Sequence, residues 1–385
     1  MGQTELAEFD LSVLAPNGMR RGRTTGSCAT AAVKAALCLL LRGERCTQVQ
    51  VTLPDGAHYL LVPIQDSRRL DQHTVRVEVL KDGGDDPDNT HGATIFAEVR
   101  RNNAGQIRFF AGGGVGTATK PGLRVAVGEP AINPVPRQMM RQAVAEVLRD
   151  GAVKVPGSGH DEGFDLTIGC ENGEVIARKT YNPRLGILGG ISILGTSGIV
   201  EPFSLSTWIA SIEVYVRVAL GDGSECVAFL PGKIARTYAK KVLDLPEERA
   251  VQIANFLGEA IDFMQLALLE KQRQLDVLWV LGHPGKLAKV LDGVWDTHSS
   301  KSSMAMGCVA RVAAELGFDP RVVQEIENAN TVEAAMERLK SESGAHALWV
   351  EIERRIAGRI GERVPAAKRV EVRLFDLSGN TLGTP

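Results

Sequence analysis

The sequence predicts an α+β domain followed by an α/β domain with a mostly parallel sheet and a helical C-terminal segment. In the first half, short alternating runs are bounded by Pro, Gly, Asp or Asn, as strands are. In the second half, strand patterns alternate with helical ones, which is typical of βαβ units in a parallel sheet. The chain has 385 residues, more than the roughly 100–200 residues usual for one domain, so we expect two domains.

The first half contains two predicted helices and a series of short strands. The segment 27–41 is rich in Ala and Leu, follows a Thr-Thr-Gly turn and ends before Gly43, which predicts a helix. A second helix is predicted over 137–149, after an Asn-Pro-Val-Pro segment that we expect to be non-helical. The predicted strands are 48–53, 58–64, 75–80, 94–100 and 106–110.

The stretch 155–163 has the Gly, Ser and charged residues of an exposed connector. We therefore predict domains at 1–155 and 164–385. In the second domain, apolar residues recur at helical spacing from Leu205 to Ala219, and 304–361 is mostly helical. The other predicted elements are strands 186–194, 225–230 and 276–281, helices 233–243, 249–271 and 286–291, and a final run, 369–375, that rejoins a sheet edge.

Composition argues against several classes of protein. Apolar residues make up 44% and charged residues 23% of the chain, the values of an ordinary globular protein. The net charge is −2 without a long basic block, which argues against a nucleic-acid partner. Six scattered cysteines without a C-x-x-C pair indicate reduced thiols rather than a disulfide framework or zinc site. The polar N-terminus and the short apolar runs predict a cytoplasmic protein with no membrane partner.

The segment 186–202, GILGGISILGTSGIVEP, is the first candidate site. Its glycines, among them Gly189, Gly190 and Gly195, would let backbone amides approach a ligand closely. Thr196 after an apolar strand suits the switch-point crevice of an open α/β sheet, and Glu201 has the chemistry to accept hydrogen bonds from ribose hydroxyls. Close packing of a helix on a sheet also requires glycines. The segment is therefore either a cofactor-binding loop or a site of close helix–sheet packing.

The segment 81–91, KDGGDDPDNTH, is the second candidate. Four aspartates crowd one turn, and like charges raise one another's pKa, which makes Asp85 and His91 candidates for an acid/base pair. Such a cluster also attracts divalent cations, and a solvated turn of Asp, Asn and Gly is the structural alternative.

Basic residues supply a third group of candidates. Arg21 and Arg23 lie just before the first predicted helix, whose N-terminus already favours anions. Lys120 follows the glycine-rich segment 112–116. Guanidinium groups bind carboxylates with two hydrogen bonds, so a substrate with many carboxylates would suit these residues. A helix cap with exposed basic neighbours is the alternative.

In the second half, two Pro-Gly-Lys turns, 231–233 and 284–286, each follow a predicted strand.

Together these segments resemble the cobalt-precorrin-5B C1-methyltransferase family of oxygen-independent cobalamin biosynthesis. The matching stretches, in family order, are GRTTGSCATAAVKAA (22–36), KDGGDDPDNTHGA (81–93), GGGVGTATKPGL (112–123), GEPAINPVPR (128–137), YNPRLGILGGISILGTSGIVEP (181–202) and LGHPGKLAKVLDGVWDTHS (281–299). Two positions depart from the family pattern: Arg23 stands where an aromatic residue is expected, and 300–304 lacks an acidic, arginine-bearing run.

The resemblance implies a methyltransferase that uses S-adenosylmethionine (SAM) to convert cobalt-precorrin-5B into cobalt-precorrin-6A. We assign SAM binding to five residues of the 186–202 segment: Gly189, Gly190, Gly195, Thr196 and Glu201. We assign binding of the substrate carboxylates to Arg21, Arg23 and Lys120. The cobalt arrives inside the corrin substrate, so no metal held by the protein is expected. A small-molecule kinase and a non-catalytic corrinoid-binding protein are the alternatives, and a homo-oligomer stays open.

Overall fold

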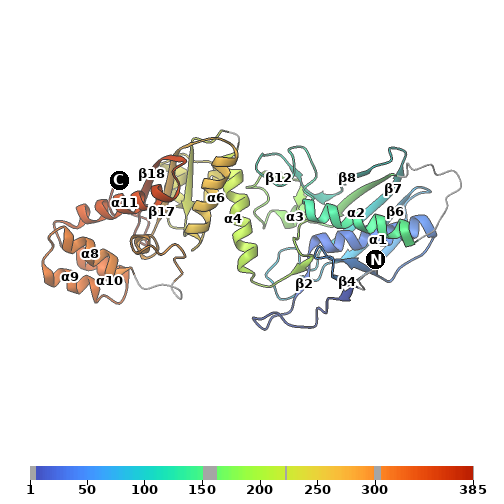
Figure 1. Ribbon diagram of the computed structural model, residues 1–385, viewed down its shortest axis with the longest axis horizontal. Coiled ribbons are helices and arrows are strands. Elements are labelled where there is room, and N and C mark those ends of the chain that lie inside the picture. Colours follow the sequence, from blue (N-terminus) through green and yellow to red (C-terminus); the bar gives the residue numbers. More distant parts are fainter. Residues whose placement is uncertain (1–5, 151–162, 222, 299–304, 385) are drawn as a thin grey trace. The chain divides into compact units, whose positions relative to one another are not determined.

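The computed structural model describes residues 6–150, 163–221, 223–298 and 305–384. Two compact units make up the chain, Met1–Ser204 and Leu205–Pro385 (Figure 1). The domain boundary predicted near 155–163 is therefore wrong, although residues 155–162 lie outside the described residues. The glycine-rich segment 186–202 belongs to the first unit, not to the unit with the parallel sheet.

The main sheet of the first unit has five strands in the order β5-β6-β7-β11-β8. Strand β11 pairs antiparallel with β7 and parallel with β8, so it lies inside the sheet. Its alternating Phe164, Leu166 and Ile168 are fully buried. A strand in this position cannot belong to a second domain, which is the physical reason for the wrong boundary. The strands are β5 (Asp66–Arg69), β6 (Thr74–Leu80), β7 (Thr94–Asn102), β8 (Ile107–Ala111) and β11 (Gly163–Cys170).

Helix α1 (Thr25–Arg42) packs against this sheet and against helix α2 (Pro134–Asp150) (Figure 1). It is long and apolar enough to span a membrane, but 83% of its apolar window is buried inside the unit. The core therefore accounts for its hydropathy. Helix α2 begins at Pro134, inside the segment predicted to be non-helical. Proline is tolerated there because the amides of the first helical turn need no partner within the helix.

Short strands complete the first unit. The strand predicted over 186–194 is wrong: two strands of two residues each flank Gly189, whose φ is +88°. A positive φ interrupts an extended strand, and glycine tolerates it best. The short elements are β1 (Ala7–Glu8), β2 (Gly22–Arg23), β3 (Gln48–Thr52), β4 (His58–Pro63), β9 (Gly114–Val115), β10 (Thr117–Ala118), α3 (Gly173–Ala177), β12 (Ile187–Leu188), β13 (Gly190–Ile191) and β14 (Ile199–Val200).

The second unit has a four-stranded sheet in the order β16-β15-β17-β18, and every pair in it is parallel. The predicted parallel sheet is therefore confirmed within this unit, as is the final strand at its edge. The strands are β15 (Cys226–Leu230), β16 (Ala250–Gln252), β17 (Leu275–Gly282) and β18 (Ala367–Leu374). Strand β16 was missed because it has three residues and was included in a predicted helix.

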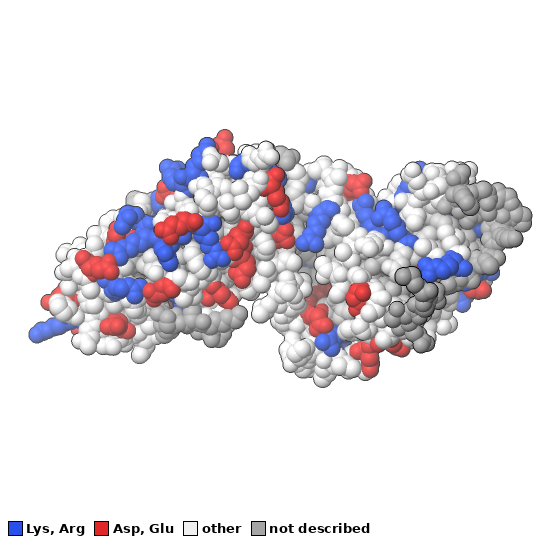
Figure 2. Space-filling view, viewed as in Figure 1, with Lys and Arg blue, Asp and Glu red and all other residues white. Residues whose placement is uncertain are grey.

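Among the described helices of the second unit, α4 precedes β15, α5 and α6 lie between β15 and β17, and five helices, α7 to α11, lie between β17 and β18. On α11, Glu351 pairs with both Arg354 and Arg355 at 2.7 Å. Figure 2 shows basic and acidic side chains interspersed on the face drawn. The helices are α4 (Leu205–Leu220), α5 (Arg236–Lys241), α6 (Leu257–Glu270), α7 (Pro284–Leu287), α8 (Met306–Glu315), α9 (Pro320–Glu327), α10 (Val332–Leu339) and α11 (Ala345–Arg363), with 3₁₀ turns at Glu247–Arg249 and Ala288–Asp292.

Candidate functional site

The first unit brings three sequence motifs together: 20–27, 81–91 and 186–203. Strand β2 pairs antiparallel with β14. Arg23 donates its backbone N–H to Asp82 O at 2.7 Å, and Gly198 O accepts from the Ser27 hydroxyl at 2.8 Å. The backbones at Gly22 and Gly83 lie too close together for a side chain at position 22, because a Cβ on Gly22 would lie 2.1 Å from Gly83 C. We call these three segments the loop cluster.

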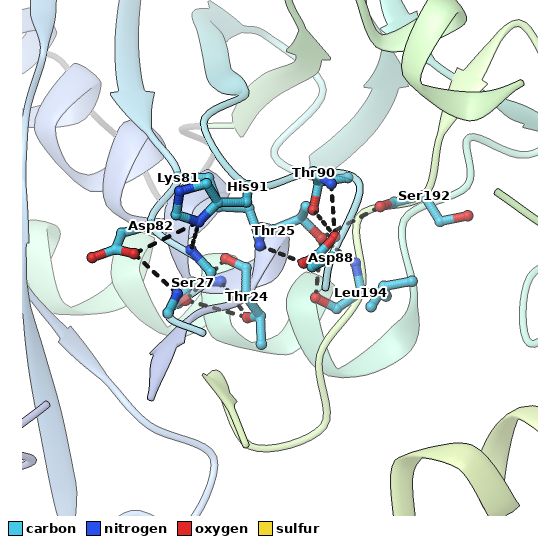
Figure 3. A network of polar contacts seen from close by, with 12 residues as sticks. Thr24, Thr25, Ser27, Lys81, Asp82, Asp88, Thr90, His91, Ser192 and Leu194 are labelled. Atoms are coloured by element: carbon cyan, nitrogen blue, oxygen red, sulfur yellow. Dashed lines mark hydrogen bonds and ion pairs between the residues drawn. The ribbon is translucent and has the colours of Figure 1, made fainter. Parts of the chain in front are cut away.

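A buried ion pair stabilises the loop cluster (Figure 3). Lys81 is only 1% exposed, and its Nζ lies 2.6 Å from Asp88 Oδ2. The other oxygen, Oδ1, accepts from the Thr90 backbone N–H and hydroxyl. Burial alone would raise the pKa of Asp88, but the Lys81 ammonium and the Thr90 donors outweigh it and hold that pKa below its usual value. Asp88 is therefore a structural carboxylate.

The N-terminus of α1 is occupied by protein groups rather than open to an anion. Thr24 caps the helix and accepts from the Ser27 amide. The Gly26 amide donates to Leu194 O at 3.0 Å, and the Thr25 hydroxyl contacts Ser192 O and Leu194 O. The amides that made this terminus a candidate anion site thus bind Thr24 and the glycine-rich segment.

The four aspartates of 81–91 hold four different partners. Asp82 accepts from the Gly84 amide, Asp85 binds Arg20, Asp86 accepts from the Phe203 amide, and Asp88 binds Lys81. The four carboxylates are therefore not gathered around one point. Among the described residues, no three His, Cys, Asp or Glu side chains are placed to hold a metal ion.

In the structure, the two members of the predicted acid/base pair, Asp85 and His91, bind other partners. Asp85 accepts from both the backbone and the side chain of Arg20, and these two contacts lower its pKa, the backbone hydrogen bond most. The carboxylate nearest His91 Nδ1 is Asp82, at 3.8 Å. His91 Nδ1 accepts the Gly83 amide at 3.1 Å, so the proton of the neutral ring sits on Nε2. His91 is 51% exposed and presents a donor to solvent.

Two residues predicted to hold different ligands bind each other. Arg21 Nε lies 2.6 Å from Glu201 Oε1, and its Nη1 donates to Val13 O and Leu14 O. Arg23, the departure from the family pattern, donates from Nη2 to Leu61 O at 3.4 Å, while its buried Nε has no hydrogen-bond partner. The side chain of Lys120 packs against Gly186, where a Cβ would lie 2.4 Å from Lys120 Cγ.

The glycine-rich segment is fixed by close contacts within the first unit. A Cβ on Gly190 would lie 2.0 Å from Gly114 O, and one on Gly195 would lie 2.6 Å from the Thr24 hydroxyl. Gly189 is the exception, because nothing lies within 4 Å of a Cβ there. Thr196 is exposed. The expectation that this segment follows a strand of an open parallel sheet is wrong, so the argument for a switch-point crevice does not apply to it.

In the second unit, both Pro-Gly-Lys turns follow the carboxyl ends of parallel strands, as predicted. Lys286 lies in the second turn, and its Nζ donates to Pro231 O of the first turn at 3.0 Å and to Ala254 O at 3.4 Å. Burial lowers the pKa of Lys286, with a smaller contribution from Lys289. The ammonium therefore ties together the segments that follow β15 and β16.

Sequence reasoning missed the residues that organise the loop cluster. Lys81, Thr24, Thr25 and Thr90 lie in the quoted motifs but were not singled out. The available signal was a lysine at the end of an alternating strand followed by an aspartate seven residues later. This lysine–aspartate pair matters because Lys81 is buried, and its burial cannot be read from the sequence.

Comparisons with known proteins identify the family. A family model described as CbiD matches residues 13–202, and one described as CbiD, C-terminal domain, matches 296–385. A relative from Ralstonia nicotianae, named cobalt-precorrin-5B C(1)-methyltransferase, is 63% identical over 97% of this chain and 96% of its own length. One of the same name from Chromobacterium violaceum is 59% identical over 97% of both chains. A crystal structure of the cobalamin biosynthesis protein cbiD from Archaeoglobus fulgidus is 26% identical, covers 80% of this chain and 88% of that one, and has a TM-score of 0.38. The chain belongs to the CbiD family.

Proposed function

We propose that this protein is a cytoplasmic methyltransferase that transfers a methyl group from SAM to C1 of cobalt-precorrin-5B. The products are cobalt-precorrin-6A and S-adenosylhomocysteine. The observation that carries the proposal is the 63% identity, over 97% of the chain, to a relative named for this reaction. The cobalt belongs to the substrate. The Lys81–Asp88 pair and the glycine contacts give the loop cluster the rigidity that a positioning surface requires.

The transfer places particular demands on the protein. A carbon–carbon bond forms at C1 while the carbon–sulfur bond of the sulfonium breaks, and the sulfur keeps the electron pair. The methyl group arrives as the equivalent of a cation, so the macrocycle either carries the added charge or releases a proton. The reaction therefore depends mainly on aligning the two reactants and excluding water.

We assign the corrin side of the reaction to the loop cluster. A corrin precursor carries many carboxylates, which guanidinium groups bind with charge-assisted hydrogen bonds. Arg21, Arg23 and Lys120 remain the proposed contacts, and Arg20 joins them because its side chain is 58% exposed. Substrate carboxylates would compete with Asp85 and Glu201 for Arg20 and Arg21. His91, with its proton on Nε2, would donate a hydrogen bond to the macrocycle.

Single-turnover methyl transfer tests the proposal. Purified protein is incubated with cobalt-precorrin-5B and SAM carrying a radioactive methyl group, and the label is followed into the corrinoid fraction. The expected result is label in the corrinoid together with an equal amount of S-adenosylhomocysteine. ATP-dependent phosphorylation without methyl transfer would instead identify a kinase. Corrinoid binding without turnover would identify a carrier.

A further inference from the structure

An exposed phenylalanine lies at the end of the loop cluster. Phe203 is 60% exposed and has a φ of +54°, in the left-handed region. Among the described residues, five other than glycine have a positive φ, and of these five Phe203 alone is aromatic. A bulky side chain rarely adopts this conformation, because its Cβ approaches the following carbonyl oxygen. Such strain persists only where the surrounding structure imposes it, and it concentrates at functional sites.

The Asp86 carboxylate holds Phe203 in this conformation. Asp86 Oδ1 accepts the Phe203 amide at 2.9 Å, although the two residues are 117 positions apart. The preceding residue, Pro202, accepts a hydrogen bond from the Asn17 side-chain amide on its carbonyl oxygen at 2.9 Å. Polar contacts therefore fix the backbone of this turn, while the phenyl ring is left mostly exposed. A phenylalanine retained only for packing would instead bury its ring.

Two more exposed apolar side chains are held near this turn. Val13 is 57% exposed and Leu14 is 50% exposed. Their carbonyl oxygens each accept from Arg21 Nη1 at 3.0 Å, and Arg21 Nε binds Glu201, two residues before Phe203. Arg21 thus ties the two segments together, and both belong to the first unit. We call Val13, Leu14 and Phe203 the apolar group.

An exposed cation accompanies the apolar group. Arg20 precedes the tie residue Arg21 in the chain, and its side chain is 58% exposed. The Asp85 carboxylate occupies the backbone N–H and Nε of Arg20, which leaves the Nη groups to bind a carboxylate of a ligand. Exposed apolar side chains beside guanidinium donors match a ligand that has apolar ring faces and carboxylate arms. A corrin precursor is such a ligand.

We infer that the apolar group is the platform on which the corrin ring lies, with the phenyl ring of Phe203 packed on the macrocycle and Arg20 binding one of its carboxylates. Burial of apolar surface against an aromatic side chain is favourable. A ring whose backbone is already fixed also loses less freedom on binding. This inference rests on the proposed function, since it takes the ligand to be cobalt-precorrin-5B.

Equilibrium dialysis of cobalt-precorrin-5B against the full chain, without SAM, tests the inference. Phe203→Ala should weaken corrinoid binding by roughly 10- to 100-fold, the worth of burying one large apolar side chain. Phe203→Tyr should restore binding because it keeps the ring. Leu14→Ser, on the other segment, should weaken binding by a smaller factor. The matched control is Phe110→Ala, which removes an exposed phenylalanine of β8 outside the loop cluster and should leave binding unchanged.

Two further variants separate the ring from the backbone that presents it. Phe203→Gly should melt a few degrees above Phe203→Ala, because glycine tolerates the positive φ, yet it should bind the corrinoid as weakly. Asp86→Ala removes the acceptor of the Phe203 amide and should weaken binding. Asp86→Asn should restore it, because the side-chain amide oxygen can accept the same hydrogen bond.

The possible failures are distinguishable. Wild-type corrinoid affinity in both Phe203→Ala and Phe203→Gly would overturn the platform while leaving the proposed function standing. A loss in Phe110→Ala as large as that in Phe203→Ala would overturn it too, since the position of the ring would then not matter. Absence of methyl transfer to cobalt-precorrin-5B by the wild-type protein would instead contradict the proposed function itself.

Discussion

Lys81 and Asp88 form an ion pair inside the first unit, with Nζ and Oδ2 2.6 Å apart and the lysine 1% exposed. The pair spans the segment that also carries Asp82, Asp85 and Asp86, which bind other parts of the loop cluster. Removing Lys81 would leave Asp88, whose side chain is 25% exposed, with the two Thr90 donors as its remaining partners. The geometry of the loop cluster therefore depends on this pair.

Lys81→Met should destabilise the protein by about 2–3 kcal/mol, the usual worth of a hydrogen bond between charged groups and below the cost of stranding a fully buried charge, because Asp88 is 25% exposed. The free energy of unfolding is measured by urea denaturation. The control is Lys340→Met, which removes an exposed pair with Glu337 and should cost no more than about 1 kcal/mol. Equal effects of the two substitutions would show that burial of the Lys81 pair contributes nothing.

The same pair predicts a pH dependence. The folded pKa of Asp88 is lowered, so its contribution to stability is present above its unfolded pKa of about 3.9 and is lost as the pH falls through the folded value. In Lys81→Met the burial effect remains without the ammonium, so Asp88 is more easily protonated. The stability difference between wild type and variant should therefore shrink between pH 7 and pH 3. A constant difference over that range would contradict the assignment.

Neighbouring glycines should respond differently to alanine. Gly189→Ala meets no atom within 4 Å, so its cost is that of an alanine at φ +88°, about 1–2 kcal/mol. Gly190→Ala places a Cβ 2.0 Å from Gly114 O and should cost about 3 kcal/mol or more, because backbone must move. Thermal denaturation of the two variants measures the difference. If Gly190→Ala melts like wild type, the close approach of β13 to β9 is not a constraint.

His91 and Asp85 should differ in their effect on methyl transfer. His91→Ala should lower the single-turnover rate by roughly 10- to 100-fold, the usual contribution of one hydrogen bond to a charged or strongly polar group. Asp85→Asn should change it by no more than a few-fold, because Asp85 is occupied by Arg20. SAM binding should be unchanged in both. A larger loss in Asp85→Asn than in His91→Ala would restore Asp85 as the acid/base candidate.

The repeating patterns were predictable and the long-range packing was not. Helix α1 and strands β3, β4, β6, β7 and β8 follow from local periodicity and turn residues. Strand β11 has an equally clear alternation at Phe164, Leu166 and Ile168, but it follows a stretch that resembles a connector, and its partners lie far back in the sequence. The domain boundary was misplaced for that reason.

The same limit applies to the candidate site. Sequence motifs identified the segments that meet in the loop cluster, because glycines and aspartates at turns are visible in the sequence. The partners of each side chain were not visible. Arg21 and Glu201 are 180 positions apart and bind each other, although they were assigned to different ligands.

The most direct test of the proposed function is the position of the transferred methyl group. Purified protein, cobalt-precorrin-5B and SAM with an isotopically labelled methyl group are incubated together, and nuclear magnetic resonance locates the label in the corrinoid product. We predict a single labelled methyl attached to C1 and one equivalent of S-adenosylhomocysteine. Label at another ring carbon, or no label in the corrinoid while SAM is bound, would contradict the proposed reaction.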